Sequence, residues 1–160
     1  MSFGPRLHPD PLCRVVLVEP LIPENTGNIS RTCVGTESEL HLVEPMGFEL
    51  NESRVKRAGL DYWPHLAWQT HASYRHWRDS VPDPSRIFLI ETGGRPIYEA
   101  NFQRGDWLVF GKETKGLDPA ILAEHETRWS IPMSGPTRSL NLSNSVAVTV
   151  FELLRQIRAF

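Results

Sequence analysis

The stretch PTRSLNLSNSVAVTVFELLRQIR, residues 136–158, joins a polar loop directly to a helix. Its second half carries apolar residues at the spacing of one helical stripe, namely Val146, Val150, Phe151, Leu154 and Ile157. This spacing leaves Thr149, Glu152 and Gln156 for the opposite side of the helix. The first half leads small hydrogen-bonding side chains toward the helix start, where backbone N–H groups are also unpaired. The stretch therefore predicts a ligand-binding loop followed by a helix that packs on another element.

Length and composition favour one globular domain. The chain has 160 residues, of which 40% are hydrophobic and 22% are charged. Its cysteines, Cys13 and Cys33, are too few for a disulfide framework, and no apolar run has the length of a signal or membrane-spanning segment, so we expect a cytoplasmic protein. The formal net charge of -2 gives no global attraction to nucleic acid. RNA binding would have to come from a local basic patch.

Short apolar runs alternate with segments that are able to form helices. The runs have strand length and span residues 14–19, 40–44, 87–91, 107–110 and 128–131. The predicted helices span 26–34, 52–58, 71–79 and 119–123, followed by the C-terminal helix. This alternation predicts a single α/β domain over residues 13–160, with a mostly parallel sheet flanked by helices and ligands at the carboxyl ends of its strands. Residues 1–12 are rich in proline and predict a flexible or loosely docked extension.

Polar loops follow several of these strands. In the first loop, residues 20–33, a proline-rich turn leads Asn25 into a helix start that is able to bind an anion, with Arg31 on the same helix. The alternative is a turn capped by Asn25 beside a solvated arginine. In the second loop, FGKETKGL over 110–117, the lysine and hydroxyl residue of a phosphate-binding loop are missing after Gly116. This loop instead offers close backbone approach at Gly111 with Glu113 nearby, or only a tight turn with exposed charges.

Other candidate sites are weaker. Cys33 has no evident base partner, and its helical position favours core packing over nucleophilic chemistry. The six histidines show no spacing typical of a metal site, so we predict no metal. The segment RVKRAGLDYW, residues 54–63, places cations beside aromatic rings, which suits single-stranded RNA. An amphipathic helix with a solvated basic face explains the same segment.

Taken together, IPENTGNISRTC (22–33), FGKETKGL (110–117) and IPM (131–133) followed by RSLNLSNSVAV (138–148) resemble the three motifs of the SPOUT methyltransferases. HLVEPMGF (41–48) and RAGLDYW (57–63) resemble the branch that methylates the 2'-hydroxyl of cytidine or uridine 34 in tRNA. The resemblance covers about residues 14–158. Agreement of several segments in the same order makes a chance match improbable.

This resemblance implies a C-terminal deep trefoil knot that binds S-adenosylmethionine, a homodimer formed through the first and last helices, and no membrane association. The cofactor-binding residues that it implies are Ile90, Gly111, Glu113, Ile131, Met133, Ser139 and Leu140. Asn141 would shape the junction between cofactor and substrate. The tRNA would bind a basic patch assembled across the dimer from Arg54, Lys56, Arg57 and Arg138.

The resemblance assigns catalysis to Arg31, with Asn25 orienting Arg31 or the ribose. A guanidinium is almost never deprotonated in proteins, so stabilisation of a developing alkoxide is favoured over proton abstraction, which stays open. Relatives often carry Pro at the position of Glu24 and Tyr at that of Phe151. A role that needs that phenol is therefore in doubt. The alternatives to methylation of nucleotide 34 are an rRNA or other tRNA position, or a non-catalytic RNA-binding knotted dimer.

Overall fold

The computed structural model describes residues 6–50, 53, 57 and 62–160. Its centre is a parallel sheet with the strand order β3-β2-β1-β5-β4-β6. The strands are β1 (Arg14–Val18), β2 (Glu39–Val43), β3 (Ala67–His71), β4 (Ile87–Pro96), β5 (Trp107–Phe110) and β6 (Arg128–Ser130). This architecture confirms the predicted parallel α/β fold.

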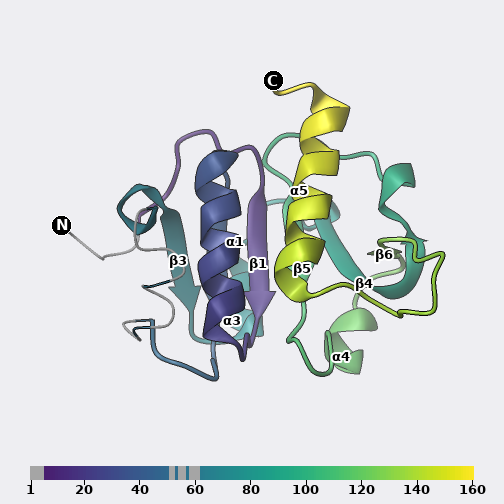
Figure 1. Cartoon of the computed structure of the whole chain (residues 1–160), viewed down its shortest axis with the longest axis horizontal. Helices are drawn as coiled ribbons and strands as arrows, with labels where there is room; N and C mark the ends of the chain where they lie inside the picture. The colour runs from purple at the N-terminus through teal and green to yellow at the C-terminus, as the bar shows by residue number, and fades with distance from the viewer. Residues whose placement is uncertain (1–5, 51–52, 54–56, 58–61) are drawn as a thin grey trace.

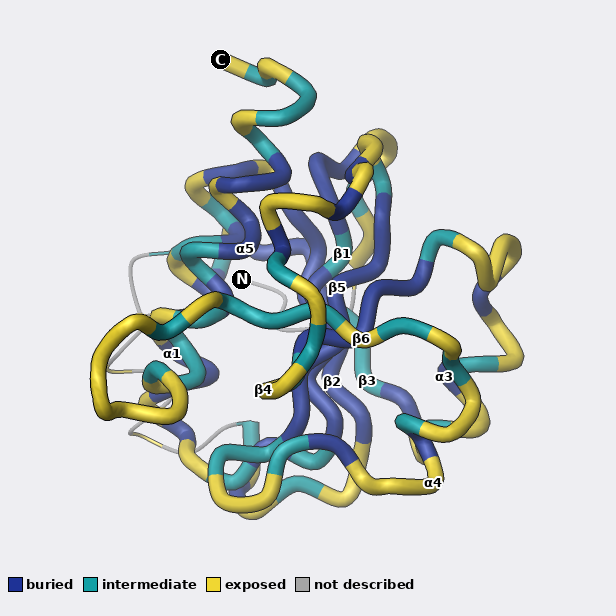
Figure 2. The backbone as a smooth tube through the Cα atoms, turned by 90° about the vertical axis from the view of Figure 1, so that its right-hand side faces the viewer, coloured by how far each residue is buried: buried dark blue, intermediate teal, exposed yellow. Residues whose placement is uncertain are grey.

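Helices cover both faces of the sheet (Figures 1 and 2). They are α1 (Pro23–Gly35), α3 (Tyr74–Ser80), α4 (Pro119–Leu122) and α5 (Leu142–Ile157), with short 3-10 turns η1 (Trp63–His65), η2 (Pro84–Arg86) and η3 (Ile97–Glu99). α1 and α5 pack on the face that carries Val15 and Leu17. α3 and α4 pack on the opposite face, which carries Val16 and Val18. Burial on both faces explains why the strands read as continuous apolar runs.

One predicted helix begins too early. Residues 71–79 were expected to be helical, but His71 is the last residue of β3, and α3 begins at Tyr74 with a Ser73 side-chain cap. The strand AWQTH was missed because its second half is polar. Gln69 and Thr70 are only half-buried, since β3 is the edge strand. Runs of apolar and β-branched residues therefore predict the buried central strands more reliably than they predict a half-exposed edge strand.

The apolar stripe predicted on the C-terminal helix is partly wrong. Val146 and Val150 are fully buried, as expected, but Phe151 is 54% exposed. Thr149 and Glu152, which were expected on the opposite side, are buried. The Thr149 hydroxyl donates to the Ser145 carbonyl at 2.8 Å, and Glu152 accepts hydrogen bonds from neighbouring side chains of the same helix. Local hydrogen bonds thus allow polar groups to occupy buried positions.

The chain before β1 lies along the edge of the sheet. Arg6 and Trp68 exchange backbone hydrogen bonds of 3.0 and 2.8 Å, and Leu12 is 2% exposed. The domain boundary expected at residue 12 stays a prediction. Most of the helix expected over 52–58 falls outside the described residues. In the part of the chain that is described, no helix is long and apolar enough to cross a membrane.

Candidate functional site

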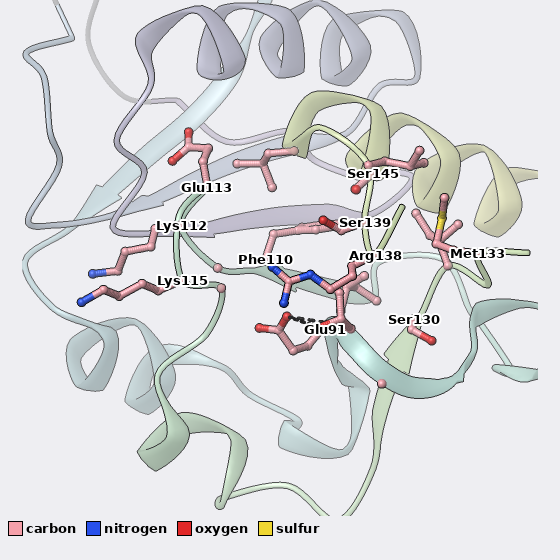
Figure 3. Close-up of a pocket in the computed structure, with 18 of the residues that line it drawn as sticks. Glu91, Phe110, Lys112, Glu113, Lys115, Ser130, Met133, Arg138, Ser139 and Ser145 are labelled. Carbon is pink, nitrogen blue, oxygen red and sulfur yellow. Dashed lines mark hydrogen bonds between the residues drawn. The ribbon is translucent and has the colours of Figure 1, made fainter. Parts of the chain in front are cut away.

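A cavity of about 640 Å³ lies at the carboxyl ends of β4, β5 and β6 (Figure 3). Its wall is built by the ends of these strands, the second loop, the third loop (residues 131–141) and the start of α5. Every residue expected to bind a cofactor lines it: Ile90, Gly111, Glu113, Ile131, Met133, Ser139 and Leu140. The structure thus brings together residues that are far apart in the sequence, and their roles remain predictions.

The second loop is folded back on itself by its glycines. The Gly116 N–H donates to the Lys112 carbonyl at 2.9 Å. A Cβ atom on Gly111 would lie 2.0 Å from the Gly116 carbonyl carbon, so no side chain fits there. Gly116 itself has a φ of +69°, a conformation that favours glycine. These two glycines, which lack the lysine and hydroxyl residue of a phosphate loop after Gly116, therefore serve a tight backbone turn that forms one wall of the cavity.

Glu113 connects the cavity to the start of α1. Its carboxylate accepts hydrogen bonds from the backbone N–H groups of Leu21 at 2.9 Å and Ile22 at 3.1 Å, and from Asn25 Nδ2 at 3.3 Å. Ile22 is the N-cap residue of α1 and has no side chain able to cap the helix. The carboxylate of Glu113 therefore caps the start of α1 by accepting the N–H of this N-cap residue and that of Leu21 before it, and it also complements the positive end of the helix dipole.

The predicted catalytic residues come from α1 and do not line the cavity. Asn25 is 5% exposed and donates to Glu113. Arg31 is exposed, and its guanidinium lies 4.9 Å from the centre of the Tyr62 ring. This cation–π contact restrains an arginine that is otherwise free to sample many rotamers. From the sequence, Tyr62 was recognised only as one of the aromatic residues in the basic segment 54–63. Nothing in the sequence indicated that it contacts Arg31.

The predicted substrate-binding residues are dispersed. Arg138 is exposed and lines the cavity. Asn141 is the N-cap of α5, and its side-chain oxygen accepts hydrogen bonds from the Ser143 N–H and hydroxyl at 2.9 and 2.6 Å. Arg57 is exposed, whereas Arg54 and Lys56 lie outside the described residues.

Sequence reasoning missed three charged residues of the cavity wall, which are Glu91, Lys112 and Lys115. Lys112 forms an ion pair with Glu19 at 3.4 Å. In Figure 3 the ammonium groups of Lys112 and Lys115 extend to the same side of the second loop. Their positions in the sequence could have indicated them, since Glu91 is the last residue of a predicted strand and both lysines lie beside Glu113 in the second loop.

A second polar cluster lies on the α3 side of the sheet, near the amino ends of β1 and β2. His41 bridges Glu39 at 2.8 Å and His71 at 2.9 Å, and Arg14 lies 3.3 Å from Glu39. Burial lowers the pKa of His71 to about 4, and the neighbouring His41 and His76 act in the same direction. Burial opposes ionisation of Glu39, but its hydrogen bonds with His41 and His8 hold its pKa below the usual range.

The remaining candidates carry no site. Cys33 is fully buried, and burial raises the pKa of its thiol well above the usual range, which confirms the prediction of core packing. Among the described residues, no group of three or more His, Cys, Asp or Glu side chains is arranged to hold a metal ion.

Comparisons with known proteins identify the family of this chain. Residues 13–151 match the SpoU rRNA Methylase family. A tRNA (cytidine(34)-2'-O)-methyltransferase of Burkholderia pseudomallei (strain 1106a) is 48% identical over 149 residues, covering 89% of this chain and 94% of the relative. The enzyme of the same name from Escherichia coli (strain K12) is 46% identical over 151 residues, covering 91% and 94%.

A solved structure described as "Structural insights into the 2-OH methylation of C/U34 on tRNA" superposes with a TM-score of 0.89 at 40% identity. The match covers 98% of this chain and all of the other. The resemblance to SPOUT methyltransferases is therefore confirmed. Because the family model matches residues 13–151, most of the sequence, this chain belongs to the SpoU rRNA Methylase family.

Proposed function

We propose that this protein is an S-adenosylmethionine-dependent methyltransferase that modifies the ribose 2'-hydroxyl of nucleotide 34, a cytidine or uridine, in tRNA. The observation that carries the proposal is the convergence of all the predicted cofactor residues on one cavity at the carboxyl ends of the strands. The named substrate of the similar enzymes supports the choice of nucleotide 34.

The cavity suits the proposed cofactor. Its volume of about 640 Å³ is in the range of small-molecule sites. Ile90, Ile131 and Leu140 offer apolar surface. When bound there, S-adenosylmethionine supplies a methyl group already activated by a sulfonium. The protein's task is then to align the ribose oxygen with that methyl group, and holding two reactants in place is worth about 7 to 11 kcal/mol.

Several residues of the chain would position the two reactants and stabilise the developing charge. Glu113 fixes the start of α1 through the Leu21 and Ile22 N–H groups, and α1 carries Arg31. In the proposed complex the guanidinium of Arg31 stabilises the negative charge that develops on the ribose oxygen and contacts an adjacent phosphate. Asn25, held by Glu113, supports that geometry. The basic side chains of Arg57 and Arg138, with Arg54 and Lys56, contact the tRNA backbone.

We also propose that the active form is a cytoplasmic homodimer with a knotted C-terminal segment. Phe151 on α5 is 54% exposed and Ile22 at the start of α1 is 41% exposed, which leaves apolar surface on the first and last helices. A partner at this surface would extend the basic patch. Membership of the SPOUT superfamily supports the proposed knot, and a crystal structure traced through residues 110–142 tests it.

The function is tested with purified protein, labelled S-adenosylmethionine and bulk tRNA from a strain that lacks the enzyme. We expect label in tRNA, and mass spectrometry of nuclease fragments should place it on the 2'-oxygen of nucleotide 34. The absence of transfer to tRNA would refute the activity. Transfer to ribosomal RNA, or to another tRNA position, would keep the reaction and overturn the proposed substrate.

A further inference from the structure

Glu91 is a carboxylate fixed in the wall of the cavity. It directly follows Ile90, which forms with Phe110 the last pair between β4 and β5. Its Oε1 accepts a hydrogen bond from the Thr92 N–H at 2.9 Å, and its Oε2 accepts one from the Leu117 N–H at 2.7 Å. A Cβ atom on Gly116 would lie 2.3 Å from Oε2, so the glycine makes room for the carboxylate. These contacts hold the negative charge in one place.

No cation of the described residues neutralises this charge by an ion pair. Its Oε2 atom can accept a further hydrogen bond. A carboxylate oxygen has two lone pairs, and Oε2 accepts only one bond from the described residues. Glu91 and Glu113 each receive three donors, since the Thr92 hydroxyl also donates to Oε1 of Glu91 at 3.3 Å. The donors of Glu113 all come from the start of α1 and its approach, whereas Glu91 stays beside β4 and β5 in the cavity wall. Glu91 is therefore the acidic group of this wall that is better placed to act on a ligand.

Apart from Glu91 and Glu113, the charged residues of the cavity wall are positive. Lys112, Lys115 and Arg138 line it, and Lys112 is partly neutralised by Glu19. In Figure 3 the Lys112 and Lys115 side chains extend away from Glu91. Their positive charges oppose the binding of a cation. A preference of this cavity for a cationic ligand must therefore come from its carboxylates.

We infer that Glu91 determines specificity by making the cavity prefer the cationic methyl donor over its neutral product. The inference rests on the proposed function, which supplies both ligands. Transfer of the methyl group to the ribose oxygen leaves the electron pair of the broken S–C bond on sulfur, and the hydroxyl proton is released to water. The sulfonium charge is thereby lost, while the charge of Glu91 is unchanged. The electrostatic attraction between Glu91 and the sulfonium therefore exists only before methyl transfer. Glu91 thus favours binding of the donor and release of the product.

The test is calorimetric titration of the full-length protein with S-adenosylmethionine and, separately, with S-adenosylhomocysteine. We expect Glu91→Gln to lower the preference for the donor about 10-fold, by weakening donor binding while product affinity changes less than 3-fold. Glu91→Asp keeps the charge and should retain most of the preference. Glu99→Gln removes an exposed carboxylate that is paired with Arg95 outside the cavity, and it should leave the preference unchanged.

Equal loss of both affinities in Glu91→Gln would overturn the inference, because Glu91 would then only hold the second loop. If Glu91→Gln does not fold, the salt dependence of the wild-type protein decides. The preference for the donor must fall as salt rises, since salt screens the attraction, and a preference independent of salt refutes the inference. Wild-type protein that binds neither ligand would instead refute the proposed function itself.

Discussion

Arg31 shows how little the local sequence says about a side chain's surroundings. As an exposed arginine on a helix it has the appearance of a solvated charge, yet its guanidinium lies against the Tyr62 ring. The ring comes from a segment distant in sequence, so helical periodicity carries no information about it. Such a contact reduces the rotamer freedom that Arg31 would lose on binding RNA.

Arg31→Ala should lower the rate of methyl transfer by about 100-fold or more, the loss typical for a donor that stabilises a developing oxyanion. Cofactor affinity should stay within about 3-fold, because Arg31 does not line the cavity. Single-turnover assays measure the first quantity and calorimetry the second. A parallel loss of both would show that Arg31 supports the fold. Arg104→Ala, at an exposed position outside this cavity, is the control.

At the scale of elements, the start of α1 depends on a residue from another loop. The sequence predicted that this helix begins at Thr26, after a turn capped by Asn25, but α1 begins at Pro23 and its N-cap residue is Ile22. The acceptor for the Ile22 N–H comes from Glu113, which no local pattern indicates. The sequence separation between the partners exceeds 85 residues, and no local rule connects them. The carboxylate of Glu113 thus connects the cavity wall to the helix that carries Arg31.

Glu113→Gln should destabilise the protein by about 1 to 3 kcal/mol, because the amide group presents an N–H to a backbone donor and leaves it unpaired. Urea unfolding measures this difference in the free energy of unfolding. Methyl transfer should fall as well, since Arg31 is carried by the same helix. Glu126→Gln, at an exposed position, should change stability by less than about 0.5 kcal/mol. A neutral Glu113→Gln would contradict the capping role.

The pair of buried histidines between β2 and β3, His41 and His71, predicts how the stability of the protein depends on pH. The pKa of His71 in the folded protein is about 4, below the 6.5 of an unperturbed histidine. The unfolded chain therefore takes up a proton first, and stability should decline as the pH falls from about 6.5 to about 4. Urea unfolding at pH 7 and pH 5 should show a smaller difference for His71→Gln than for wild type. An exposed control, His65→Gln, should keep the wild-type difference, and an unchanged difference in His71→Gln would refute the prediction.

On the scale of the whole molecule, charge is distributed unevenly. The formal net charge is -2, yet Lys112, Lys115 and Arg138 gather around one cavity. A phosphate backbone responds to such local groups and not to the sum over the chain. Net charge alone would have counted against an RNA substrate.

If Lys115 and Arg138 contact phosphates, the dependence of tRNA affinity on salt should change when they are removed. Each lost contact should reduce the slope of log affinity against log salt by about 0.7 to 0.9. Filter binding at several salt concentrations measures these slopes for Lys115→Ala and Arg138→Ala. Arg104→Ala should keep the wild-type slope. Identical slopes in all variants would place the tRNA elsewhere on the protein.

The exposed apolar surface of α5 bears on assembly. If α5 lies at a dimer interface, Phe151→Glu buries a charge there and should shift the protein toward monomer. Light scattering coupled to gel filtration should report roughly half of the wild-type mass. The Tyr98→Glu variant, which alters another exposed aromatic residue, should keep the wild-type mass. A wild-type protein that is already monomeric would refute the dimer.

The sequence by itself determined the elements whose residues are buried on both sides, such as β1 and β5, and the loops that follow them. It also determined the glycine turn of the second loop, because backbone conformation at Gly116 is a local property. Only the tertiary structure decided that His71 ends a strand, that Thr149 and Glu152 are buried, and that Glu113 caps α1. Each of these three features depends on contacts between atoms that packing brings together. The spacing of neighbouring residues in the sequence therefore cannot predict them.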